Sequence, residues 1–444
     1  MFRLLAPCSL LLLLAAGSLA ANPGPAVDAC LRALSRQGGF SGTALVARDG
    51  RVLLSKGYGP ANREWKIANT PWTKFRVGSI TKQFTAAAIL LLQERGQLNV
   101  QDPIGKYLAD CPEAWKGVTI HHLLSHTSGI PDQVIISDPK QRTAPPNLDD
   151  MAAHGKDIPL LFPPGEKWAY SNAGYILLGY LIEKLSGQRY GQFLQENIFT
   201  PLGMTSTGYD DGRAVIGGRA AGYVRKGITL LNTGYTNPDV AHAAGALYST
   251  TEDLYRWEQA LFGGKVLSPA SLQAMTTEVA GGYGYGQSIG TQFKHTVISH
   301  IGRINGYVSY LGYFPAERVT IILLLNYDIG LVAIENLSRD VAAICLGEPY
   351  QPPTATVIAV DPHLFDAYAG TYELSPDYRI TVTRKGDCLF VQAPGQPETE
   401  LFPTAPGAFF IKGIDTRISF TKDARGQITG MTLWQNGNHT AQKL

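Results

Sequence analysis

The sequence predicts a mixed α/β (α+β) fold: a mostly antiparallel sheet flanked by helices, with an inserted helical subdomain, followed by a small C-terminal all-β domain. Three observations carry this prediction. Strand patterns occur near the start of the chain, where apolar and polar residues alternate, and again around residues 296–326. The residues between them, 79–261, have mainly helical patterns. Beyond residue 361, short alternating stretches recur between Gly-containing turns, which is typical of an antiparallel barrel or sandwich.

The first two strands are expected to flank a tight turn. Residues 41–47 and 51–57 alternate around Asp49-Gly50, a dipeptide that favours a hairpin turn. Helices are expected next at residues 86–95, 120–125, 171–185 and 250–262. The last of these opens with Thr250 as a cap and has acidic residues in its first turn, a pattern that favours a helix start.

Strands return after the helical region, at residues 296–300, 307–314 and 319–326. The third is almost wholly apolar, as expected of a central strand that is buried on both faces. A helix at 336–346 closes this domain, which we place at residues 21–346. The Pro-rich residues 347–361 are expected to form a linker. Residues 362–444 then form the second domain, with strands at 378–383, 389–392, 408–411 and 417–421.

Composition and charge narrow the classes of function. The chain has 444 residues, and its 38 basic and 36 acidic residues give a formal charge of +2. Such a balance gives no indication of a nucleic-acid surface or a polybasic membrane patch. Residues 1–20 are predicted to be a secretory signal, because Arg3, a short apolar run and the small residues around Ala20 occur in the usual order. We therefore expect a secreted or periplasmic protein with no stable membrane anchor after cleavage.

Cysteine and histidine patterns suggest neither a metal nor another cofactor. Outside the predicted signal, four cysteines (Cys30, Cys111, Cys345 and Cys388) show no C-x-x-C spacing, so that one or two disulfides and buried free thiols both remain open. His122 and His126 are four residues apart, but the pair lacks an intervening Glu and an identified third ligand. We therefore predict no metal site.

The first motif with catalytic potential is Ser79-Ile80-Thr81-Lys82. Three residues are nearly one helical turn, so Ser79 and Lys82 are expected on one face at the start of a helix. A hydroxyl needs a nearby group to take its proton before it can attack a carbonyl, and a desolvated Lys can do so. On its own the tetrad is better explained as a Ser helix cap followed by a solvated Lys than as a nucleophile with its base.

Two further motifs follow in the chain. Tyr170-Ser171-Asn172 closes a Pro- and Gly-containing loop before an apolar helix, and supplies a phenol and an amide. His300-Ile301-Gly302 lies on a predicted strand before a Gly turn, where backbone N–H groups can help form an oxyanion hole. Glu166 is a further candidate base, although its Pro-Gly-Glu context is typical of a solvated loop.

In this order and spacing, the three motifs resemble those of the serine β-lactamase and penicillin-binding protein superfamily, in its class C β-lactamase-related branch. The resemblance covers residues 40–346 and extends to the stretches 120–131 and 244–254. It implies that Ser79 forms an acyl-enzyme, that Lys82 and Tyr170 share its activation, and that Asn172 orients the substrate. The general base remains open between Lys82 and Tyr170. The resemblance also implies an oxyanion hole formed by the N–H groups of Ser79 and Arg303.

The chain departs from the family pattern at the third motif. His300-Ile301-Gly302 stands where many relatives have K-T-G. The Lys of that triad helps bind a substrate carboxylate in β-lactamases, and a neutral His does this less well. Arg303 can supply the missing charge, narrow the pocket or remain a solvated residue at a strand edge.

We therefore expect an exported serine hydrolase that cleaves an amide or ester bond, most simply a peptidase, amidase or esterase. A β-lactamase is one alternative. A receptor that binds penicillin or peptidoglycan, with slow turnover or none, is another. The expected partner is a small-molecule or peptide substrate, including fragments derived from the cell wall, and not a nucleic acid.

Overall fold

The computed structural model describes residues 22–36, 38–108, 111–134, 151, 153, 155–226, 229–350, 360–411, 416–434 and 438–444. The predicted signal at 1–20 lies outside these residues, as does most of the predicted linker. Within the described part of the chain, no helix is long and apolar enough to cross a membrane. All four cysteines of the described part are free thiols.

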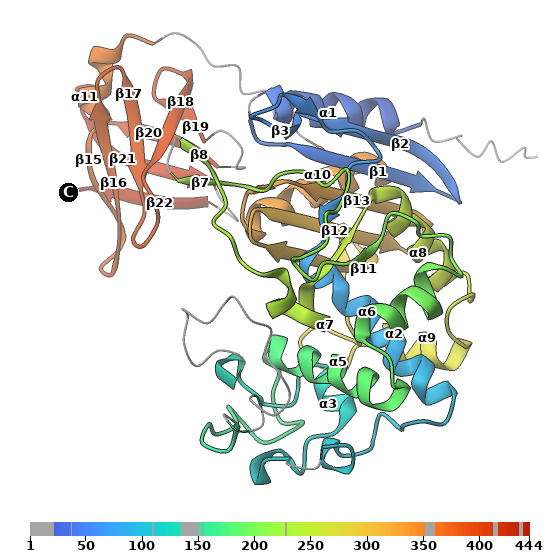
Figure 1. Cartoon of the computed structure of the whole chain (residues 1–444). Coiled ribbons are helices and arrows are strands. Elements are labelled where there is room, and N and C mark those ends of the chain that lie inside the picture. The colour runs from blue at the N-terminus through green and yellow to red at the C-terminus, as the bar shows by residue number, and fades with distance from the viewer. Residues whose placement is uncertain are drawn as a thin grey trace, which may run out of the picture.

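A six-stranded antiparallel sheet forms the centre of the larger domain, in the order β10-β11-β12-β13-β1-β2 (Figure 1). Its strands are β1 (Gly42–Arg48), β2 (Arg51–Tyr58), β10 (Ser288–Gln292), β11 (His295–Ile304), β12 (Tyr307–Phe314) and β13 (Val319–Leu325). The expected hairpin turn is present, with positive φ angles at Asp49 and Gly50. Because β1 pairs with β13, the two ends of this domain meet in one sheet, which confirms the predicted antiparallel architecture.

Both faces of the sheet are covered by helices. One face packs on α1 (Gly24–Arg36) and α10 (Leu331–Leu346), and the other packs on α2 (Thr81–Glu94) and α8 (Thr251–Phe262). Along β13, Ile321 and Leu323 belong to the apolar core on the side of α1 and α10. Ile322 and Leu324 belong to the apolar core on the side of α2 and α8. This alternation explains why the sequence of β13 is continuously apolar.

The inserted region is mainly helical. Its helices are α3 (Ile120–Leu124), α5 (Asn172–Ser186), α6 (Tyr190–Leu194), α7 (His242–Gly245) and α9 (Pro269–Thr276). The short strands around the domain are β3 (Pro60–Asn62), β4 (Ile67–Ala68), β5 (Phe75–Arg76), β6 (Gly208–Tyr209), β7 (Tyr223–Lys226), β8 (Thr229–Asn232), β9 (Leu247–Ser249) and β14 (Tyr327–Asp328). Ser171 caps α5, because its hydroxyl accepts a hydrogen bond from the N–H of Gly174.

Several helices and strands are longer than the sequence predicts. α2 begins at Thr81 and not at residue 86, and α10 begins at Leu331 and not at 336. β11 extends from His295 to Ile304 because its pairing with β12 continues to the turn. The helix α1 has no counterpart among the predicted elements.

The C-terminal domain is a closed barrel of eight strands, drawn in orange to red in Figure 1. The strands are β15 (Gly370–Ser375), β16 (Tyr378–Lys385), β17 (Cys388–Gln392), β18 (Thr399–Ala405), β19 (Ala408–Phe410), β20 (Arg417–Lys422), β21 (Ile428–Trp434) and β22 (Asn438–Lys443), preceded by α11 (Phe365–Tyr368). Antiparallel pairing of β15 with β22 closes the barrel. Tyr368, Tyr372, Phe409 and Phe420 pack together in its core. Of the two predicted alternatives, barrel and sandwich, the barrel is therefore the one observed.

Candidate active site

Ser79 lies between a short strand and a long helix. β5 leads through Val77 into a single 3-10 turn, Gly78–Ile80, and α2 follows directly from Thr81. Ser79 thus lies in the 3-10 turn directly before α2, at the N-terminal end of this helix. Gly78 has φ +51°, a conformation that is unfavourable for residues with a side chain. Ser79 is half-buried in this turn.

Lys82 lies in the first turn of α2 and has no exposed surface. Its Nζ atom is 3.0 Å from Ser79 Oγ, 2.9 Å from Asn172 Oδ1 and 2.8 Å from the carbonyl oxygen of Ala244. Burial lowers the pKa of Lys82 to about 7, and the charge of Asp132 opposes this change. A substantial fraction of this amine is therefore neutral near pH 7 and able to accept a proton.

Tyr170 ends the loop before α5, with 38% of its surface exposed. Its ring faces the ammonium group, with Lys82 Nζ 4.8 Å from the ring centroid. Desolvation of the phenol raises the pKa of Tyr170 above its ordinary value, and an interaction with Ser79 lowers it only in part. The phenol is therefore protonated at neutral pH.

Asn172, the first residue of α5, connects two parts of the site. Its Oδ1 accepts from Lys82, and its Nδ2 donates to Asp132 Oδ2 at 2.9 Å. Asp132 also accepts a hydrogen bond from the N–H of Ala173 at 3.0 Å. Sequence reasoning missed Asp132, although it directly follows the family-like stretch 120–131. That adjacency was the available signal.

His300 lies on β11 and is almost completely buried. Its Nδ1 is 2.7 Å from the carbonyl oxygen of Ile301, and its Nε2 is 2.8 Å from the hydroxyl of Tyr283. Burial and the nearby charge of Lys82 lower the pKa of His300 to about 3. The imidazole is therefore neutral at physiological pH, and both of its nitrogens have partners. Tyr283 is a second residue that the sequence analysis did not identify.

Gly302 and Arg303 bring β11 against the turn that carries Ser79. A Cβ atom on Gly302 would lie 1.9 Å from the carbonyl oxygen of Val77, and one on Gly78 would lie 2.8 Å from the backbone N of Arg303. The backbone of Arg303 thus runs next to the Ser79 turn. The Arg303 side chain is 53% exposed and pairs with Asp328 through two nitrogens, each 2.9 Å from a carboxylate oxygen.

The remaining candidates have other contacts. Nδ1 of His122 accepts from the N–H of Thr119 at 3.2 Å, and Nδ1 of His126 accepts from the N–H of Ser171 at 3.1 Å. In the part of the chain that the structure describes, no three His, Cys, Asp or Glu residues form a group suited to a metal ion. Glu166 is exposed in a turn.

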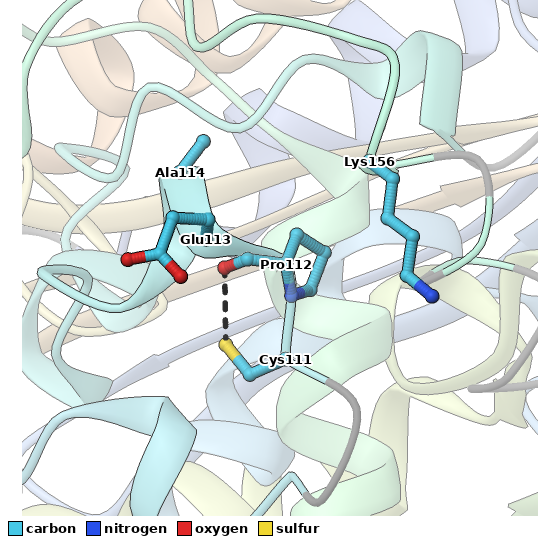
Figure 2. Close-up of a pocket in the computed structure, with 5 residues that line it drawn as sticks. All are labelled: Cys111, Pro112, Glu113, Ala114 and Lys156. Atoms are coloured by element: carbon cyan, nitrogen blue, oxygen red, sulfur yellow. Dashed lines mark hydrogen bonds between the residues drawn. The ribbon is translucent and has the colours of Figure 1, made fainter.

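A separate pocket of about 630 Å³ is lined by Cys111, Pro112, Glu113, Ala114 and Lys156 (Figure 2). The thiol of Cys111 is directed to the carbonyl oxygen of Pro112 at 3.6 Å, and burial raises the pKa of this thiol. A raised pKa makes a thiol a poor nucleophile at neutral pH. None of the predicted site residues lines this pocket.

Comparison with protein families divides the chain into two matched parts. A family model described as Beta-lactamase matches residues 27–343. A second model, described as a domain of unknown function (DUF3471), matches residues 354–442.

Individual proteins show the same relationship. Penicillin-binding protein 4* of Bacillus subtilis (strain 168) is 30% identical over 412 residues, which are 86% of this chain and 90% of that protein. The structure of a D-stereospecific amidohydrolase from Streptomyces sp. matches with 27% identity and a TM-score of 0.58, over 69% of this chain and 94% of the other. The octameric penicillin-binding protein homologue from Pyrococcus abyssi is similar in fold, with a TM-score of 0.66 and 24% identity, over 94% of this chain and 99% of the other.

Proposed function

The chain belongs to the β-lactamase family of the β-lactamase and penicillin-binding protein superfamily, and from this premise we propose that it is a serine hydrolase that cleaves an amide or ester bond through an acyl-enzyme on Ser79. The observation that carries the proposal is the 3.0 Å contact between Lys82 Nζ and Ser79 Oγ. A serine hydroxyl requires such a base, because its own pKa leaves it protonated at neutral pH.

We assign the general base to Lys82. A neutral amine has two N–H groups and one lone pair. Asn172 Oδ1 and the carbonyl oxygen of Ala244 are two acceptors within 2.9 Å of Nζ. When these acceptors take the two N–H groups, the lone pair is left for the hydroxyl proton of Ser79. Because desolvation brings the pKa of Lys82 to about 7, this neutral form is well populated.

In the acylation step, Ser79 Oγ bonds to the carbonyl carbon while its proton passes to Lys82. The N–H groups of Ser79 and Arg303 are proposed to stabilise the oxyanion, since the two backbone segments run side by side. Tyr170, protonated at neutral pH, then delivers a proton to the leaving nitrogen or oxygen and regains one from Lys82. A water molecule hydrolyses the ester to Ser79, which restores the free hydroxyl and releases the acid.

The charges around the site favour substrates without a carboxylate near the scissile bond. His300 is neutral, and the guanidinium of Arg303 is paired with Asp328. Neither residue offers a free cation of the kind that a K-T-G lysine supplies. We therefore propose an amidase, peptidase or esterase in preference to a β-lactamase. The similarity to a D-stereospecific amidohydrolase supports D-amino-acid amides as the first substrates to test.

A labelling experiment tests the nucleophile. Wild-type protein is treated with a fluorophosphonate probe and with a fluorescent penicillin, with Ser79→Ala as the control. We expect Ser79-dependent labelling by the fluorophosphonate. Absence of labelling by both probes would exclude Ser79 as the nucleophile. Turnover is then measured on p-nitrophenyl esters, D-aminoacyl anilides and nitrocefin, where rapid hydrolysis of nitrocefin would instead support the β-lactamase alternative.

We also propose that the protein is exported, because residues 1–20 have the pattern of a secretory signal. The test is to express the full chain in a bacterial host, recover the periplasmic and culture fractions, and sequence the N-terminus of the product. A mature chain that starts near Ala21 is expected. An intact N-terminus in the cytoplasmic fraction alone would contradict export.

A further inference from the structure

Next to the site, α7 contains a residue with an unusual backbone. His242 has φ +35° and ψ −129°, a conformation that is normally confined to glycine. The residue is 7% exposed. Such a conformation is unfavourable for a residue with a side chain, so surrounding contacts must hold it in place. Strained residues of this kind cluster at functional sites, which makes those contacts informative.

The imidazole of His242 is held by a partly buried chain of polar groups. Its Nδ1 atom is 2.9 Å from the hydroxyl of Tyr209, and that hydroxyl donates to the carboxylate of Asp239. Since Tyr209 has a single proton and donates it to Asp239, His242 must donate its Nδ1–H to Tyr209. The rings of Tyr180 and Tyr190 also pack on the imidazole, with centroids 5.0 and 5.1 Å away.

On its Nε2 side, the imidazole lies so close to α5 that residue 179 must be a glycine. A Cβ atom on Gly179 would lie 2.8 Å from His242 Nε2 and 2.5 Å from Ala243 Cβ. α7 can therefore approach α5 this closely only because residue 179 has no side chain. The polar chain and the close helix contact together fix the position of His242.

The two residues after His242 direct their carbonyl groups at α2. The carbonyl oxygen of Ala243 accepts from Thr85 Oγ1 at 2.7 Å, and that of Ala244 accepts from Lys82 Nζ at 2.8 Å. A residue that returned to an ordinary negative φ at position 242 would rotate the following peptide groups. The carbonyl of Ala244 would then no longer be directed at Lys82.

We infer that His242 is a positioning residue for catalysis: anchored by Tyr209 and Asp239, it holds the backbone conformation that places the Ala244 carbonyl on Lys82 and so directs the lone pair of Lys82 at Ser79. This inference rests on the proposed function, and it adds a role for residues that do not touch the substrate. On this inference, the hydrogen-bonded chain from Asp239 through Tyr209 to His242 orients the base, Lys82.

The test compares His242→Gly with His242→Ala. Glycine adopts a positive φ without strain, whereas alanine is strained there and can relax to a negative φ. We expect kcat to fall by about ten- to hundred-fold in His242→Ala, as is typical when a catalytic group is displaced slightly, and to fall less in His242→Gly. Tyr209→Phe, which removes only the hydroxyl, should lower kcat in the same direction with little change in KM. His363→Ala, at an exposed histidine before the barrel, is the control.

The pH profile separates positioning from a general loss of stability. The Ala244 carbonyl stabilises the ammonium form of Lys82, so its loss should shift the acidic limb of kcat/KM to lower pH while the plateau falls. The inference would be overturned if His242→Ala and Tyr209→Phe left both kcat and the acidic limb of kcat/KM unchanged. It would also be overturned if His242→Ala and His242→Gly lost the same amount of kcat while circular dichroism showed both to be folded. If Ser79→Ala is as active as the wild type, the proposed function fails instead, and the two failures are distinguishable.

Discussion

The Nζ atom of Lys82 lies 3.0 Å from the Oγ atom of Ser79, on a side chain that has no exposed surface. The contact joins the two ends of a tetrad that crosses from a 3-10 turn into α2. A buried lysine usually requires a carboxylate at contact distance to remain charged. Here the contacts to Nζ come from a hydroxyl, an amide oxygen and a carbonyl oxygen. With no carboxylate of the described residues in contact, desolvation dominates and lowers the pKa of Lys82 to about 7.

Replacement of Lys82 tests its role as the base. Both Lys82→Ala and Lys82→Arg should lower kcat by about 10²- to 10⁴-fold, the range expected for loss of general acid–base catalysis. Arginine retains the charge but does not deprotonate in this pH range, so a merely electrostatic role would leave Lys82→Arg substantially active. The measurement is steady-state turnover of a p-nitrophenyl ester, with the thermal unfolding midpoint as a check on folding. High activity of Lys82→Arg would exclude Lys82 as the base.

The pH dependence of kcat/KM should follow the protonation of Lys82. The pKa of Lys82 is about 7, and the neutral form is the active one, so activity should rise with pH through about 7. Asp132 raises this pKa through its negative charge. In Asp132→Asn the acidic limb should therefore move to lower pH. A shift to higher pH, or a profile that is flat from pH 5 to 9, would contradict this assignment.

Tyr170→Phe separates leaving-group protonation from nucleophile activation. Poor leaving groups such as amines need a proton when they depart, whereas p-nitrophenolate does not. The variant should therefore lose about 10²-fold or more in kcat on anilides, within the range for acid catalysis, and much less on p-nitrophenyl esters. Equal losses on both substrates would indicate that Tyr170 acts on Ser79 instead. Comparison of the two substrates within one variant provides its own control for folding.

The motif residues and the general fold could be predicted from the sequence because both have local signatures. A continuous apolar run identified β13, and the Asp49-Gly50 turn identified the first hairpin. The contacts of Asp132, Tyr283 and the Ala244 carbonyl could not be predicted, because each joins segments that are far apart in the chain. A backbone carbonyl has no residue signature at all. The hydrogen bond between His300 Nε2 and Tyr283 was likewise not predictable, because it depends on how Tyr283 packs against β11.

Gly302 should be essential for the approach of β11 to the Ser79 turn. A Cβ atom at this position would lie 1.9 Å from the carbonyl oxygen of Val77 and 2.4 Å from Ser309 Oγ, so the strand would have to move. We expect Gly302→Ala to lower the free energy of unfolding by about 1–3 kcal/mol, as for other overpacked sites, and to reduce kcat through the oxyanion hole. Gly290→Ala on β10 has no atom within 4 Å of the added carbon and is the matched control. Equal behaviour of the two variants would contradict the role of Gly302.

Glu258 should make the stability of the protein depend on pH. This residue of α8 is 2% exposed, its Oε2 accepts from Thr320 Oγ1 at 2.9 Å, and burial raises its pKa from 4.5 to about 7. A carboxyl whose pKa is raised by folding binds a proton in the native state that the unfolded chain has already released. Its effect is therefore to lower stability as pH rises from 4.5 to about 7, by up to about 3 kcal/mol.

Glu258→Gln removes this titration while keeping the shape of the side chain. Its free energy of unfolding, measured in urea at pH 5 and pH 8, should change less between the two pH values than that of the wild type, and the variant should be the more stable protein at pH 8. Glu113→Gln, at a side chain that is 85% exposed, should follow the wild type at both pH values. If Glu258→Gln kept the full difference between pH 5 and pH 8, the pH-dependent destabilisation would have to come from other groups, because the buried carboxyl on α8 would no longer be present to cause it.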